Sequence, residues 1–100
     1  MNYFSLSDEA LAELLALTMT ANEYGTIYRN HLGQFHRVHG PAVILNCGRR
    51  YWYHMGQRHR ADGPAIEFSN GTKYWFLNDE QLTEEEWNEI RPWLRPVLLN

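Results

Sequence analysis

The sequence has one cysteine, one lysine and no long apolar run. Because Cys47 has no partner cysteine in the chain, no intrachain disulfide can form, and a reducing compartment fits best. No apolar stretch reaches the length of about 18 residues that a membrane-spanning helix needs. The start, MNYFSLSDEALAELL, lacks the basic region and the small-residue cleavage site of a signal peptide. We therefore expect a cytoplasmic protein without membrane contact.

Basic charge is scarce and unevenly placed. Residues 1–24 contain four acidic side chains and no basic one, which gives −4. Residues 25–82 contain six Arg and Lys73 against four acidic residues, which gives +3, and residues 83–100 give −2. All five histidines lie in the middle section. A weakly basic centre between acidic ends permits an acidic partner, but +3 is a small charge for a nucleic-acid binder.

The middle of the chain is a tandem repeat. Residues 33–42 and 56–65 are identical at seven of ten positions when they are aligned at an offset of 23, and both contain the motif HRxxGPA. The same offset aligns Tyr28, Tyr51 and Tyr74. The chain therefore contains two full units and a leading half unit.

Each unit has the residue pattern of a β-hairpin. The predicted strand segments are 43–46, 49–55, 66–69 and 72–78. The returning segments are rich in Tyr and Trp, which suit a pleated surface. The segments of the second unit are joined at Asn70 and Gly71, and Asn-Gly is the strongest signal for a two-residue hairpin turn. Successive hairpins of this kind predict one antiparallel meander.

The expected register assigns the two faces of the sheet. If Asn-Gly is a two-residue turn, Glu67 pairs with Tyr74 and Ile66 pairs with Trp75. Alternation then places Ile66 and Trp75 on the core face, and Glu67 and Tyr74 on a wetter face. The side chains predicted to bind a partner are Tyr28, Ile44, Arg49, Tyr51, Tyr53, Tyr74 and Phe76.

Helices are expected at both ends. Apolar residues recur at helical spacing over residues 8–20, and acidic residues begin that segment. Thr83 and Glu86 form a capping-box pattern, and Pro92 limits the helix that follows. The predicted fold class is α+β: an antiparallel β-meander of tandem 23-residue hairpin repeats, capped by an N-terminal helix and a short C-terminal helix. The single domain 1–100 divides into an N-terminal helical cap (1–24), the repeat sheet (25–82), and a C-terminal helix with an apolar tail (83–100).

The repeat motif resembles that of a family of short proteins built from HRxDGPA repeats, which are similar to MORN-type repeats. The residues that carry the motif and its aromatic position are His36, Arg37, Gly40, Pro41, Trp52, His59, Arg60, Asp62, Gly63, Pro64 and Trp75. In the first unit His39 stands where the motif has Asp. The resemblance implies a β-rich repeat fold and a bacteriophage or viral origin, with the host cytoplasm as location. It implies no particular activity.

A structural role is the better interpretation of the motif residues. Arg60 and Asp62 flank a tight turn, where the carboxylate can accept backbone amides and the guanidinium can pair with it. Zinc sites use tight ligand pairs, but His36-x-x-His39 occurs once, because its counterpart is His59-x-x-Asp62. We therefore expect no enzyme activity, no metal and no cofactor.

The expected function is a non-enzymatic protein-binding module. Contiguous exposed aromatic residues are rare on monomers unless they bind something, and Tyr and Arg dominate interface hot spots. With the phage resemblance, the expected partner is a host protein of defence, transcription or replication, which the module blocks or modulates. One alternative is a nucleic-acid-binding sheet that uses Arg and Tyr on one face. The second alternative is a homodimeric structural repeat protein.

Overall fold

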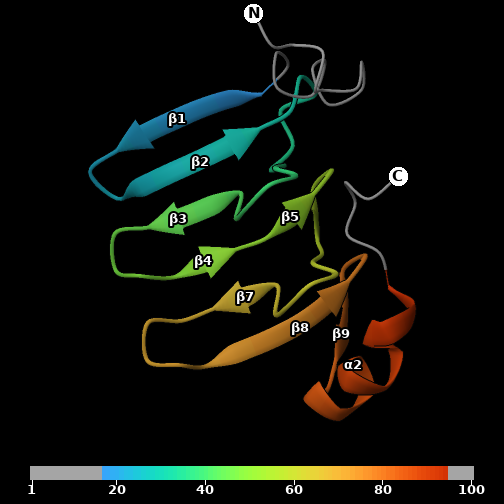
Figure 1. Cartoon of the computed structure of the whole chain (residues 1–100). Helices are drawn as coiled ribbons and strands as arrows, with labels where there is room; N and C mark the ends of the chain where they lie inside the picture. The colour runs from blue at the N-terminus through green and yellow to red at the C-terminus, as the bar shows by residue number, and fades with distance from the viewer. Residues whose placement is uncertain (1–16, 95–100) are drawn as a thin grey trace, which may run out of the picture.

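The computed structural model describes residues 17–94, which form a mostly antiparallel β structure (Figure 1). The elements are β1 (Thr18–Asn22), β2 (Gly25–Arg29), β3 (Val43–Leu45), β4 (Arg50–Tyr51), β5 (Tyr53–His54), β6 (Gln57–Arg58), β7 (Ile66–Glu67), β8 (Lys73–Leu77), β9 (Glu80–Leu82), α2 (Glu84–Ile90) and the 3-10 turn η2 (Arg91–Trp93). A seven-stranded sheet has the order β1-β2-β3-β4-β7-β8-β9, and β5 pairs with β6. Figure 1 shows the hairpins stacked in chain order, with α2 beside β9 at the far end.

The predicted α+β class with a helix at each end is wrong. Within the described residues, Thr18–Asn22 is the strand β1, which pairs along its whole length with β2. The Asn22 side chain accepts the N–H groups of Tyr24 and Gly25, at 2.7 and 3.2 Å, and so stabilises a tight turn. At residues 18–20, pairing with β2 therefore outweighs the helical spacing of the apolar residues. The rest of the predicted helix, residues 8–16, lies outside the described part of the chain.

The C-terminal helix begins as predicted. The Thr83 hydroxyl accepts the Glu86 N–H at 3.0 Å, and the Glu86 carboxylate accepts the Thr83 N–H at 2.9 Å, which confirms the capping box. Helix α2 ends at Ile90, and Pro92 lies in η2. Trp87 is buried, and its ring centroid lies 6.4 Å from that of Trp75, so α2 covers the last strands of the sheet.

The core of the described residues is thin. The buried apolar side chains are Ala42, Val43, Ala65, Phe76 and Trp87. No large side chain there is completely buried. Most aromatic residues of the sheet are therefore half-buried, and a single sheet with one short helix leaves apolar surface available on its faces.

The hairpin turns contain three residues, so the expected register is wrong by one. The Phe68 N–H donates to the Thr72 carbonyl at 2.9 Å, and Gly71 lies between them with φ +93°. A glycine at positive φ suits a three-residue turn with a bulge as well as a two-residue turn. As a result Ile66 pairs with Tyr74 rather than with Trp75. A slip of one residue moves every side chain of β8 to the opposite face from the one expected.

The leading half unit is offset by one further residue. The Tyr28 N–H donates to the Ala42 carbonyl at 2.8 Å, and the Trp52 N–H donates to the Ala65 carbonyl at 2.7 Å. Tyr28 therefore occupies the place of Trp52, not the place of Tyr51 that a constant offset predicts. The turn between β1 and β2 also has one residue fewer than the later hairpin turns.

Candidate functional site

One apolar row crosses most of the sheet. We call it the tyrosine row, and its members are Ile27, Val43, Tyr51, Ile66 and Tyr74. Each member lies directly opposite the next, on β2, β3, β4, β7 and β8 in turn. Directly opposed side chains in a sheet are about 5 Å apart and contact each other. Tyr74 at the end of the row is 38% exposed, while Val43 within it is buried.

The opposite face carries a charged row. Ile44 pairs with Arg50, Arg50 with Glu67, and Glu67 with Lys73. A guanidinium nitrogen of Arg50 lies 3.9 Å from a carboxylate oxygen of Glu67. The same strands therefore present an apolar face with two tyrosines and a polar face with both signs of charge. This difference makes the tyrosine row the stronger candidate for a contact surface.

Two of the predicted partner-binding residues, Ile44 and Tyr28, do not belong to the tyrosine row. Ile44 belongs to the charged row. The guanidinium carbon of Arg37 lies 4.0 Å from the ring centroid of Tyr28, so Arg37 covers that ring. Tyr51 and Tyr74 are the predicted residues that share one row.

The remaining predicted residues make internal contacts. Phe76 is only 5% exposed, and the Arg58 guanidinium lies 4.3 Å from its ring centroid. Tyr53 contacts Phe35 edge-on at 5.3 Å, and burial raises the pKa of the Tyr53 phenol. Arg49 lies over the Phe68 ring at 4.5 Å.

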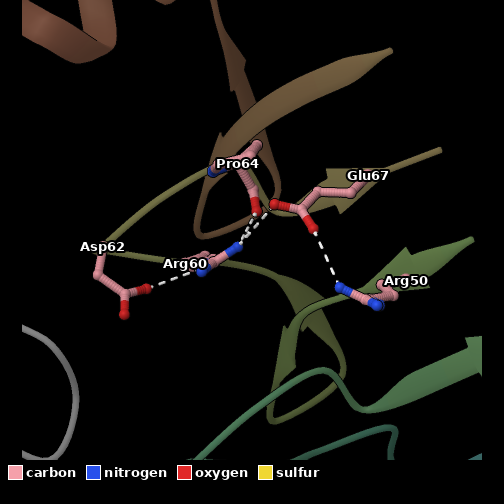
Figure 2. A network of polar contacts seen from close by, with 5 residues as sticks. All are labelled: Arg50, Arg60, Asp62, Pro64 and Glu67. Carbon is pink, nitrogen blue, oxygen red and sulfur yellow. Dashed lines mark hydrogen bonds and ion pairs between the residues drawn. The ribbon is translucent and has the colours of Figure 1, made fainter. Parts of the chain in front are cut away.

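The second HRxxGPA copy forms a closed polar network, shown in Figure 2. Arg60 Nε donates to the Asp62 carboxylate at 2.8 Å, and Arg60 Nη1 donates to the Pro64 carbonyl at 3.1 Å and to Glu67 at 3.2 Å. Its guanidinium also stacks on Trp52 at 3.9 Å. The motif arginine thus joins its own turn to Glu67 on β7 and to Trp52, which lies between β4 and β5. The carboxylate of Asp62 pairs with the guanidinium, as the sequence led us to expect.

The small residues of the motif leave room for that arginine. A Cβ atom on Gly63 would lie 2.8 Å from the Arg60 guanidinium carbon, so a side chain at this position requires the guanidinium to shift from its partners. Ala65 is completely buried, and its N–H donates to the Tyr74 carbonyl at 2.9 Å. The Gly-Pro-Ala segment therefore has a packing role as well as a turning role.

The motif histidines accept backbone hydrogen bonds. The Met55 N–H donates to His36 Nδ1 at 2.8 Å, and the Asn78 N–H donates to His59 Nδ1 at 3.0 Å. An accepting Nδ1 requires the neutral ring with its proton on Nε2. Burial lowers the pKa of His59, which favours the same form. The sequence reasoning missed this role, although the recurrence of His36 and His59 at the same position of the two units was a signal for it.

The first HRxxGPA copy has the same geometry without the acids. Arg37 Nη1 donates to the Pro41 carbonyl at 3.3 Å, and the guanidinium stacks on Tyr28. The positions equivalent to Asp62 and Glu67 hold His39 and Ile44. Across residues 17–94, no carboxylate pairs with Arg37.

A pocket of about 440 Å³ lies between the two motif loops. Its walls include Arg37, His39, Trp52, His59, Arg60 and Asp62. Residues 23 positions apart thus come together in one cavity, because consecutive units stack. The sequence reasoning did not predict this pocket, since it treated the loops as isolated turns.

The arginines of the repeat region contact groups of the chain itself. Their partners are Phe35 for Arg29, Tyr28 for Arg37, Phe68 for Arg49, Glu67 for Arg50, Phe76 and Asp79 for Arg58, and Trp52, Asp62 and Glu67 for Arg60. Hydrogen bonds from Arg58 lower the pKa of Asp79. Guanidinium groups that stack on the protein's own rings cover the ring faces that bases would need.

Between residues 17 and 94, no three His, Cys, Asp or Glu side chains gather closely enough to hold a metal ion. No helix within this part of the chain has the length and apolar character needed to cross a membrane. Comparison of the chain with protein-family models, with curated proteins and with solved structures gives no match.

Proposed function

We propose that this protein is a non-enzymatic binding module that holds another protein against the tyrosine row. The observation that carries the proposal is the unbroken apolar row across β2, β3, β4, β7 and β8. Tyr51 and Tyr74 are separated in it only by Ile66. Tyrosine contributes large contact area at a small cost in side-chain entropy, and it is frequent at interface hot spots.

The chemistry of this surface favours a protein over a nucleic acid. The arginines that would bind phosphates are stacked on aromatic rings or paired with carboxylates of the same chain. Of the alternatives, a nucleic-acid-binding sheet therefore has the weaker support. The resemblance to phage-encoded repeat proteins makes a host protein the partner we propose, and binding to it would block or modulate that protein.

An affinity-capture experiment with matched variants tests the proposal. The full chain is immobilised and exposed to a bacterial lysate, beside the double variant Tyr51→Ser/Tyr74→Ser and the opposite-face variant Arg50→Ala/Lys73→Ala. We expect a discrete protein to bind to the wild type and to the opposite-face variant but not to the tyrosine variant. Circular dichroism of each variant checks that the sheet is retained.

The same material separates the alternatives. Light scattering of the isolated chain reports whether it is a monomer or a dimer. If the wild type is a dimer and the tyrosine variant is a monomer, the partner of the tyrosine row is a second copy of this chain and not a host protein. Nucleic acid released as the salt concentration rises would favour the nucleic-acid alternative. Equal capture by all three proteins would contradict a role for the tyrosine row.

A further inference from the structure

We propose that the pocket between the two motif loops binds a carboxylate of the partner protein, which pairs with Arg37. The inference rests on the proposed function only in assigning the carboxylate to a protein. It is independent of the tyrosine row, because Arg37 and the pocket belong to the motif loops.

The second motif copy shows how a carboxylate binds to this scaffold. Asp62 lies beside Arg60 with an N–O distance of 2.8 Å, and Glu67 approaches the same guanidinium at 3.2 Å. The equivalent of Asp62 in the first copy is His39, and the equivalent of Glu67 is Ile44. The two arginines thus differ in what neutralises them, although both stack on a ring and donate to a proline carbonyl.

Arg37 has unused hydrogen-bonding capacity. A guanidinium has five N–H groups, and among the described residues the Arg37 guanidinium donates only to the Pro41 carbonyl. Tyr28 fixes the plane of the guanidinium from one side, so little freedom is lost when an acid binds. A half-buried guanidinium forms a stronger charged hydrogen bond than one in open water.

The pocket has space and charge suited to one acidic side chain. It measures about 440 Å³, and Arg37 lies in its wall. Asp62 is the acidic residue of the lining, and Arg60 holds its carboxylate at 2.8 Å. The remaining positive charge of the lining is that of Arg37. The carboxylate of a glutamate, an aspartate or a chain terminus therefore pairs with Arg37 in the first copy as Asp62 pairs with Arg60 in the second.

A peptide titration followed by NMR tests this inference without the natural partner. The probe is the blocked tripeptide Ac-Gly-Glu-Gly-NH2, its control is Ac-Gly-Gln-Gly-NH2, and Ac-Gly-Gly-Gly with a free C-terminus tests the chain-terminal source. We expect saturable shifts of the Arg37 Nε–H and Trp52 indole N–H signals with a carboxylate probe and not with the glutamine control. Whichever carboxylate probe binds more tightly identifies the source.

The variant His39→Asp supplies the missing acid within the chain. We expect it to fold, because it copies the second motif, and to reduce peptide affinity by about threefold, because the internal carboxylate competes with the peptide for Arg37. Lys73→Ala, on the opposite sheet face, is the matched control and should bind as the wild type does. Equal shifts with the Glu and Gln peptides, or unchanged binding by His39→Asp, would overturn the inference.

The outcomes separate this inference from the proposed function. Peptide binding at Arg37 together with equal capture by the tyrosine variants would leave the pocket in place and reject the tyrosine row as an interface. Selective capture by the tyrosine row without peptide binding would reject the pocket and leave the proposed function intact.

Discussion

The two HRxxGPA copies share one scaffold and differ in how its arginine is neutralised. In each copy the arginine stacks on an aromatic ring from earlier in the chain, Tyr28 or Trp52, and donates to the proline carbonyl of its own turn. Within residues 17–94, acids pair with the motif arginine in the second copy alone, where they are Asp62 and Glu67. The comparison teaches that the arginine, the ring beneath it and the proline carbonyl hold both motif loops, whereas the acids that neutralise the arginine differ between the units.

The largest effect is expected from removing the ring beneath a motif arginine. Trp52→Ala removes the stacking surface of Arg60 and should lower the free energy of unfolding by about 3 kcal/mol, the usual cost of deleting a packed aromatic residue. Chemical denaturation measures the loss. Tyr28→Ala in the leading half unit is the comparison, and it should cost less because that ring is smaller and lies near the sheet edge. A larger loss for Tyr28→Ala would contradict the assigned order.

A similar comparison uses the motif glycines. Gly63→Val places a Cβ atom 2.8 Å from the Arg60 guanidinium carbon, and three acceptors hold that guanidinium. We expect a loss of about 2–3 kcal/mol, as for other overpacked sites. Gly40→Val is strained for a different reason: its Cβ atom meets Arg37 at a milder 3.2 Å, but Gly40 lies at φ +153°, a backbone conformation that L side chains rarely adopt. Thermal melts that show Gly63→Val as stable as the wild type would contradict the close packing of this glycine against Arg60.

His59 predicts pH-dependent stability. Burial lowers the pKa of His59 in the folded chain, so the unfolded chain takes up the proton first as the pH falls below about 6.5. The contribution of His59 is therefore complete above that pH and is lost as the pH falls through the lowered pKa. His59→Leu also leaves the Asn78 N–H without its acceptor, which should cost about 1–2 kcal/mol. Denaturation at pH 7.5 and 5.5 tests both effects, and a variant with the wild-type pH dependence would contradict the role of His59.

The smallest effects come from exchanging the acids between the copies. His39→Asp gives Arg37 a carboxylate and should raise the free energy of unfolding by about 0.5 kcal/mol, because the pair is partly exposed to solvent. Asp62→His should lower it by a similar amount, since Glu67 still neutralises Arg60. Differential scanning calorimetry measures both changes. Shifts of the same sign would show that the two copies are not equivalent sites.

The repeat, the stacked hairpins and the capping box were predictable from the sequence because each depends on local residue chemistry. The HRxxGPA spacing fixed the unit length, and Thr83 with Glu86 marked the start of α2. Strand β1 could not be predicted in this way. Its residues acquire extended structure from pairing with β2, and sequence periodicity alone does not report that contact.

The register and the pocket depended on finer geometry. Gly71 at positive φ fits a two-residue or a three-residue turn. The difference of one residue in turn length decides which face of the sheet Tyr74 occupies. Tyr51 and Tyr74 were predicted to share a face, and they do, but with Ile66 rather than Glu67 between them. The walls of the pocket come from the motif loops of two different units, so the sequence of one motif alone could not predict it.

Site-specific photo-crosslinking tests the binding surface most directly. A photoreactive phenylalanine analogue replaces Tyr51 or Tyr74 in one set of proteins and Arg50 or Lys73 in another, and each is irradiated in a bacterial lysate. The account predicts a discrete protein adduct from the tyrosine positions and none from the positions on the opposite face. Adducts of equal yield from both faces, or adducts with nucleic acid, would contradict it.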